Sequence, residues 1–118
     1  MKKIAIPVEN DILCNVFEHA TQFKIFTTED QNIKDEKLIT APNHQFGLFP
    51  FWLQMHGITD VITHNIKHET INKFNCMKTN VFVGVEIKEA TTLLREFIQG
   101  NLETNAGICD HENQYSQK

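Results

Sequence analysis

The feature that most constrains the fold is a nearly continuous apolar run close to the start of the chain, residues 2–8, which reads K-K-I-A-I-P-V. A strand with apolar side chains on both sides has to be covered on both faces, as central strands of α/β sheets are. Pro7 is tolerated because it stands near the end of the run, where a missing ladder donor matters least. The run therefore predicts a sheet with helices on both faces.

Two further strands are predicted after a polar loop that spans residues 9–21. Apolar and polar residues alternate over 22–27, which is the period of two expected of a strand. A turn-rich polar segment follows at 28–32, and residues 33–41 return as a more polar strand. The two strands are therefore expected to form an antiparallel hairpin.

The second half of the chain predicts helices alternating with strands. Pro50 suits the first turn of a helix and Gly57 suits a helix C-cap. The apolar residues from Ala90 to Ile98 recur at helical spacing, and Gly100 is placed to end that helix. The predicted elements are a helix over 47–57, a strand over 60–63, a helix over 67–77, a strand over 81–85 and a helix over 90–99.

This order, three strands and then helix, strand, helix, strand, helix, defines an α/β domain. Right-handed crossovers set the later strands parallel to the first and give a mixed five-stranded sheet in the order 3-2-1-4-5. The 118 residues, 41% of them hydrophobic, suffice for one core. Residues 1–103 are expected to form the domain, and 104–118 a polar, flexible tail.

Charge and cysteine usage narrow the classes of function. The net charge of −4 opposes binding to nucleic acid or to anionic membrane surfaces. No apolar run approaches the length of a signal peptide core or a membrane span. The three cysteines are widely spaced and form no C-x-x-C pair, so free thiols in a reducing compartment are expected. The protein is predicted to be soluble and cytoplasmic.

Soft donor side chains gather at one predicted edge of the sheet. Strands 1, 3, 4 and 5 end on the same edge, and ligands of open α/β sheets bind outside the carboxyl ends of the strands. Thiolate and imidazole groups suit iron, copper, zinc or sulfide-bridged clusters. The candidate ligands in the loops of this edge, in order of preference, are His44, His19, Cys14 and His64.

Each candidate residue could also have a purely structural role or none. Loop histidines are commonly solvated, and no pair here has tight ligand spacing such as H-E-x-x-H. Cys76 is expected to pack at a helix end. The sequence Cys109-Asp110-His111 fits either a ligand arm that folds back over the edge or a mobile tail. The aromatic cluster at 49–52 fits the core, or alternatively a surface for a partner protein.

Enzymatic readings find little support. The chain carries no G-x-S-x-G, P-loop or G-x-G-x-x-G motif. A carboxylate cluster for two metal ions lacks enough acids at strand ends, and Asp60 begins its strand at the opposite edge. Cys14 and His19 resemble a nucleophile and base, but nothing positions a third partner for them. A catalytic role is therefore not predicted.

Several loosely defined motifs occur in a familiar order. They are Met1 to Val8, the pattern Phe17, His19, Ala20 and Phe23, the pattern Pro42, His44, Gly47, Pro50 and Leu53, and Gly57 to Ile62. Together they resemble the dinitrogenase iron-molybdenum cofactor biosynthesis family of small nitrogenase accessory domains. The resemblance covers about residues 1–103, and Cys109-Asp110-His111 is similar to a common tail of that family.

The resemblance implies a ribonuclease H-like motif without nuclease activity, in a protein that binds or carries iron-sulfur or molybdenum-containing clusters. The chain departs from the family pattern in two loops. Glu18 follows Phe17 where a glycine is usual, and residues 63–67 replace a glycine-rich stretch. Bulkier residues keep the backbone further from a ligand, so the pocket is predicted to be narrower or remodelled. The family's cluster, a bare metal ion, another cluster and no metal at all stay open as alternatives.

The leading hypothesis is a non-catalytic binding or carrier protein for a metal or a cluster, with a cluster-donating or cluster-receiving protein as its partner. The alternative is a metal-free interaction or regulatory domain on the same fold. The cluster's identity, the relevance of nitrogen fixation and the oligomeric state stay open at this point.

Overall fold

The computed structural model describes residues 1–41 and 49–105. In these ranges no helix is long and apolar enough to cross a membrane. The elements in chain order are β1 (Lys2–Glu9), β2 (Ile12–Leu13), the 3-10 turn η1 (Phe17–His19), β3 (Gln22–Glu29), β4 (Asn32–Thr40), α1 (Phe49–Met55), β5 (Asp60–Ile62), α2 (His68–Cys76), β6 (Asn80–Phe82) and α3 (Ala90–Gln99).

The strands form one mixed sheet in the order β4-β3-β1-β5-β6, with β2 paired to β1 beside this path. β3 is antiparallel to both of its neighbours, whereas β5 is parallel to β1 and β6 is parallel to β5. The predicted order of the five longer strands is therefore confirmed. The predicted number of strands is wrong, because the sheet has six. The assignment to ribonuclease H-like folds stays a prediction.

The sequence did not predict β2, which pairs with a part of β1 that β5 leaves unpaired. On one side β1 pairs with β3 along residues 2–8, and on the other side β5 reaches only Ile4 and Ala5. β2 folds back through a turn at Asn10 and Asp11, both with positive φ, and pairs with Val8 and Glu9. Two residues are too short a strand to show any periodicity in the sequence.

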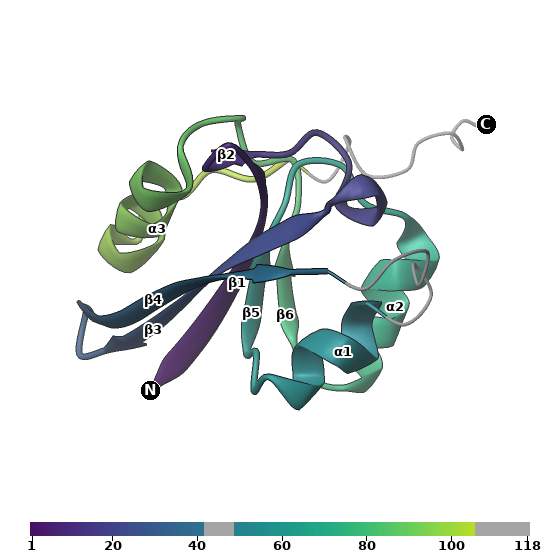
Figure 1. Cartoon of the computed structure of the whole chain (residues 1–118), viewed down its shortest axis with the longest axis horizontal. Coiled ribbons are helices and arrows are strands. Elements are labelled where there is room, and N and C mark those ends of the chain that lie inside the picture. Colours follow the sequence, from purple (N-terminus) through teal and green to yellow (C-terminus); the bar gives the residue numbers. More distant parts are fainter. Residues whose placement is uncertain (42–48, 106–118) are drawn as a thin grey trace.

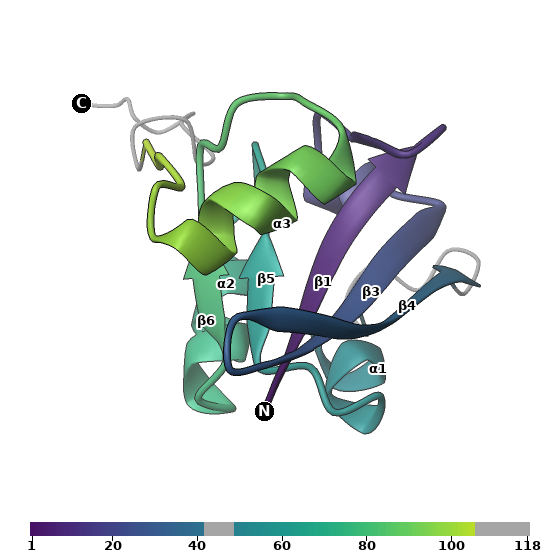
Figure 2. The same cartoon turned by 90° about the vertical axis from the view of Figure 1, so that its left-hand side faces the viewer.

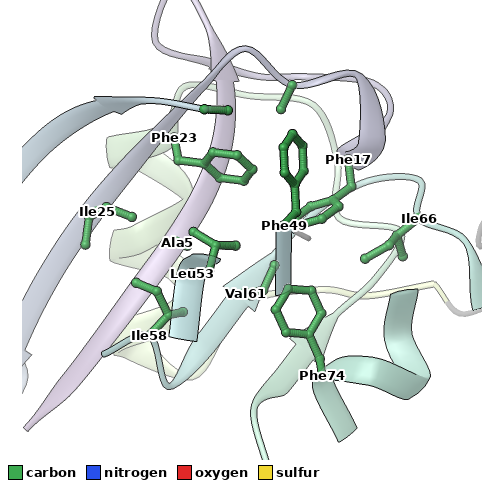
Figure 3. Close-up of a cluster of buried hydrophobic side chains, with 12 residues drawn as sticks. Ala5, Phe17, Phe23, Ile25, Phe49, Leu53, Ile58, Val61, Ile66 and Phe74 are labelled. Carbon is green, nitrogen blue, oxygen red and sulfur yellow. The ribbon is translucent and has the colours of Figure 1, made fainter. Parts of the chain in front are cut away.

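Helices cover both faces of the sheet, as the apolar run of β1 predicts. α1 and α2 lie on one face and α3 lies on the other (Figures 1 and 2). Along β1, Ala5 joins the core under α1 and α2, whereas Ile4 and Ile6 join the core under α3. Four of the five fully buried phenylalanines, Phe17, Phe23, Phe49 and Phe74, pack edge to face in the first core (Figure 3).

The last strand is shorter than predicted. β6 ends at Phe82, whereas the sequence predicts a strand as far as Val85. Gly84 has a φ of +72°, which turns the chain away from the sheet after two further residues. The stop of α3 is confirmed, because Gly100 is its C-cap with a φ of +76°.

The free edge of the sheet, β4, is exposed along nearly its whole length. Thr27 pairs with Asp35 and Thr28 pairs with Ile33, which leaves Lys34 as the extra residue of a β-bulge. A bulge and charged side chains on an edge strand oppose pairing with a second sheet edge. The edge is therefore protected against association.

Candidate metal-binding rim

The candidate site lies where β1, β5 and β6 end, at the upper edge of the sheet in Figure 1. We call this edge the rim and define it by the loops 10–21, 63–67 and 83–89, which follow β1, β5 and β6. Two predicted donor groups, His44 and Cys109-Asp110-His111, lie outside the described residues.

Buried aromatic packing holds the first rim loop in place. Phe17 is fully buried, and its ring lies 5.5 Å from Phe23, 5.9 Å from Phe49 and 5.7 Å from Phe74, measured between centroids. Such edge-to-face pairs stabilise beyond the area they bury. The ring therefore anchors the turn η1, which also carries Glu18 and His19.

Backbone hydrogen bonds join this loop to the loop after β5. The Phe17 amide donates to the Asn65 carbonyl at 2.8 Å, and the Asn65 amide donates to the Asn15 carbonyl at 3.1 Å. Val16 and Asn65 form an isolated parallel bridge. Cys14 and His64 each precede one of the joined residues, so the fold brings two predicted ligand loops side by side.

Cys14 and His19 line the same hollow, which has a volume of about 240 Å³ and also includes Glu9. The Cys14 thiol donates to the Val16 carbonyl at 3.1 Å. Burial raises the pKa of Cys14, and the charges of Glu9 and Glu18 add to the increase. The thiol is therefore protonated at neutral pH, and a metal has to displace its proton.

His64 lies on the neighbouring loop and does not line that hollow. Its Nδ1 is 2.9 Å from the Val85 carbonyl oxygen, which can only accept, so Nδ1 carries the proton in this contact. In the neutral imidazole, Nε2 is then the nitrogen that carries the lone pair. Histidines that ligate metals usually donate their other ring nitrogen to a carbonyl or carboxylate in this way, which fixes the tautomer.

A residue that sequence reasoning noted only as a departure from the family, Glu18, is the buried charge of the rim. It is 5% exposed, and one carboxylate oxygen accepts from the Lys67 amide at 3.1 Å, at the start of α2. Its other oxygen, Oε1, has no hydrogen-bond partner in the described structure, and the same holds for Thr63 Oγ1. The only sequence signal for this position is that Glu18 follows a phenylalanine, a residue type that is often buried.

The described rim does not by itself assemble a complete ligand set. No three His, Cys, Asp or Glu side chains of residues 1–41 and 49–105 group closely enough to hold a metal ion. Cys76, expected to pack, is exposed at the end of α2. Asp60 begins β5 at the opposite edge, as predicted. In the aromatic cluster Phe49 is core, whereas Phe51 is 50% exposed.

The fold and the rim define a class, namely a small α/β domain with soft donors at the carboxyl edge of a mixed sheet. The family model described as "Dinitrogenase iron-molybdenum cofactor" matches residues 1–100. The chain belongs to this family, as its motifs indicate. No curated protein matches the chain.

Solved structures share the fold. The crystal structure of PH0822 superposes with a TM-score of 0.83 at 25% identity, covering 88% of this chain and 95% of that one. A protein of Methanocaldococcus jannaschii, described as a candidate dinitrogenase, gives 0.72 at 23% identity and covers 88% and 94%. The apo form of the orange protein from Desulfovibrio gigas gives 0.75 at 15% identity and covers 90% and 94%.

Proposed function

We propose that this protein binds and delivers a metal or a metal-sulfur cluster at the rim and does not catalyse a reaction. The observation that carries the proposal is His64, whose Nδ1 is committed to the Val85 carbonyl while Nε2 is left as the lone-pair nitrogen. Membership of a family described by the iron-molybdenum cofactor supports the same reading. The cargo is held by few donors, which suits release to a partner protein.

Some of the donor groups at the rim suit a soft metal ion or a metal-sulfur cluster. Imidazole and thiol groups suit zinc, iron, copper or the edge of a sulfide-bridged cluster. Cys14 has to lose a proton whose binding is strengthened by burial, so its contribution is expected to grow with pH. A cluster held by four thiolates has no counterpart among the described cysteines, which are Cys14 and Cys76.

Anaerobic loading tests the proposal. Protein is incubated with iron and sulfide or with thiomolybdate, desalted, and examined by elemental analysis and visible absorption. Stoichiometric metal with a sulfide-to-metal charge-transfer band is expected, and the band should weaken in His64→Ala and in His44→Ala, the variant of the first sequence candidate. Cys76→Ser, an exposed residue at the end of α2, is the control. Colourless, metal-free protein under all conditions would refute the carrier role.

One observation favours a second function, the docking of a partner protein. Phe51 and Met55 are one helical turn apart on α1 and are 50% and 85% exposed. Apolar side chains at this spacing form one face of a helix. A cluster-receiving partner and a regulatory partner both suit this face. Cytoplasmic location stays a prediction.

A further inference from the structure

A second hollow lies away from the rim, between α3 and the turn that joins β3 to β4. Figure 2 shows the last turn of α3 above that turn. The hollow has a volume of about 460 Å³, a size typical of sites for small molecules. None of the residues that line it belongs to the rim loops. We call it the α3 hollow, and the residues that line it include Lys2, Thr28, Phe82 and Phe97.

The floor of the α3 hollow is apolar and largely aromatic. Phe82, Phe97 and Ile98 line it, pack against the core under α3 and are only partly buried. The rings of Phe82 and Phe97 meet edge to face, with centroids 5.5 Å apart and an angle of 79° between their planes. A further aromatic ring is stabilised when it packs on such a pair in the same geometry. The floor therefore favours a ligand with an aromatic body.

The polar groups of the hollow include a directly paired couple of residues on β1 and β3. Lys2 is paired with Thr28 across the two strands, and the side chains of such a pair lie close together on one face of the sheet. Lys2 Nζ lies 5.3 Å from the centroid of the Phe97 ring on α3. Lys2 forms no ion pair within residues 1–41 and 49–105. Its ammonium group therefore rests on an aromatic ring and has no described anion beside it.

Thr28 supplies a second donor beside this ammonium group. The residue is 5% exposed and lines the hollow, and its hydroxyl forms no hydrogen bond with the described residues. Such a hydroxyl gains a hydrogen bond when a ligand brings an acceptor. The two oxygens of a carboxylate accept from an ammonium and a hydroxyl at once, and the bond from the ammonium is charge-assisted. The pair therefore suits a carboxylate.

Charge at the same hollow limits the ligand to a single negative charge. Glu29 and Asp30, at the turn after β3, also line the hollow and are exposed. Two acidic residues and one lysine repel a doubly charged group such as a phosphate monoester more strongly than a single carboxylate. A monoanion is thus favoured over a phosphate.

We propose that the α3 hollow binds a small aromatic monocarboxylate. Its carboxylate accepts hydrogen bonds from Lys2 Nζ and the Thr28 hydroxyl, and its ring packs on Phe82 and Phe97. Burial of the ring provides affinity, and the two donors fix the orientation of the ligand. The site is separate from the rim and does not depend on a metal there.

Titration of the full chain, labelled with ¹⁵N, with 3-phenylpropionate tests this proposal by nuclear magnetic resonance. Saturable shifts are expected for the amides of Lys2, Thr28 and Phe97, with a dissociation constant of about 1 mM or lower. The neutral 3-phenylpropionamide, the cationic 2-phenylethylamine and the dianionic phenyl phosphate should all bind more weakly. These three probes change the charge of the ligand while keeping its ring.

Two variants test the donors without removing a described hydrogen bond of either side chain. Lys2→Gln and Thr28→Val should each weaken binding of 3-phenylpropionate by about threefold to tenfold. Lys37→Gln removes the same charge from exposed β4, away from the hollow, and is the matched control that should leave the affinity unchanged. Thermal midpoints of the three variants verify that each is folded.

Several outcomes would overturn the proposal. The first is the absence of saturable shifts at millimolar 3-phenylpropionate. Equal binding of the amide or of the phosphate would show that the hollow does not select a monocarboxylate. Shifts confined to the rim loops or to α1 would place the ligand elsewhere. All of these outcomes leave the carrier role at the rim to be decided by metal loading.

Discussion

The two ends of the sheet each bury a carboxylate and satisfy it differently. Away from the rim, Asp60 is 1% exposed and accepts from Thr59 Oγ1 at 2.7 Å and from Asn80 Nδ2 at 2.9 Å. At the rim, Glu18 is 5% exposed and accepts only from the Lys67 amide, while Oε1 has no partner in the described structure. Both carboxylate oxygens of Asp60 thus accept a hydrogen bond, whereas Glu18 keeps one buried oxygen without a described hydrogen-bond partner.

This difference in hydrogen bonding indicates that the functional site lies at the rim. A buried polar atom without a partner destabilises the native state, and native proteins tolerate few of them. Violations of this kind are expected at functional sites, because the rest of the fold supplies the missing stability. The rim has two such atoms, on Glu18 and Thr63. Measurements of stability at both ends can therefore break or sharpen the comparison.

The largest effect is expected at the ring that anchors the rim. Phe17→Ala removes a fully buried side chain that contacts three other aromatic rings. Such truncations cost about 3–5 kcal/mol of unfolding free energy, from lost burial and from the cavity left behind. Urea unfolding followed by circular dichroism measures the loss. Phe51→Ala, at 50% exposure, is the control and should change stability far less. Equal losses in the two variants would contradict the anchoring role.

The second-largest loss of stability is expected at Asp60, at the end of the sheet away from the rim. Asp60→Asn keeps the size of the side chain but places an amide NH₂ opposite one of two donors, Thr59 Oγ1 or Asn80 Nδ2. The hydrogen bonds to a charged carboxylate become bonds to a neutral amide, and the Thr59 hydroxyl has to accept from the NH₂ while it donates to the Lys3 carbonyl, which together cost about 1–3 kcal/mol. Chemical denaturation at neutral pH provides the measurement. A variant as stable as the natural chain would show that the charge of Asp60 contributes nothing to its two hydrogen bonds.

A smaller effect concerns the thiol in the rim hollow. Because burial raises the pKa of Cys14, its thiolate fraction at neutral pH is below that of an ordinary thiol. In a Cys109→Ser background, iodoacetamide should modify Cys14 more slowly than exposed Cys76, because the Cys14 sulfur is partly buried and burial raises its pKa. Mass spectrometry of the two peptides follows both rates in one sample.

The pH dependence has a definite sign. A raised pKa in the native state means that the native state holds the proton more tightly than the unfolded chain does, so the stabilising effect is present below the ordinary thiol pKa and is lost as the pH rises through the native value. Modification of Cys14 should therefore accelerate at a higher pH than that of an ordinary thiol. Equal rates and equal pH profiles would show that the hollow does not shield the thiol.

Much of the fold could be predicted because its determinants are local. The two-sided apolar run of β1 requires helices on both faces, and right-handed crossovers then fix the order of the longer strands. β2 and the end of β6 were missed for a physical reason. β2 exists because β5 leaves part of β1 unpaired, and β6 ends where its pairing with β5 ends, at Ile62 opposite Phe82, and both depend on tertiary contacts.

The candidate site was predictable as a location rather than as a geometry. Topology placed Cys14, His19 and His64 on one rim, but the sequence could not show that only the first two share a hollow. The tautomer of His64 depends on the Val85 carbonyl, which is 21 residues away. The buried state of Glu18 likewise depends on the Lys67 amide. Such long-range partners leave no trace in local patterns.

The smallest stability change is expected for Glu18→Gln, the counterpart of Asp60→Asn at the rim. The glutamine carbonyl oxygen keeps the bond from the Lys67 amide, and the substitution removes a buried charge whose second oxygen has no described partner. Removing the buried charge stabilises the native state, whereas leaving the NH₂ unpaired destabilises it. The two effects oppose each other, so the free energy of unfolding should change by no more than about 1 kcal/mol in either direction. Comparing the two variants under identical urea conditions tests the contrast between the ends. A loss at Glu18 as large as that at Asp60 would mean that a water or an ion completes Oε1 in solution, and the rim would then be as well satisfied as the opposite end.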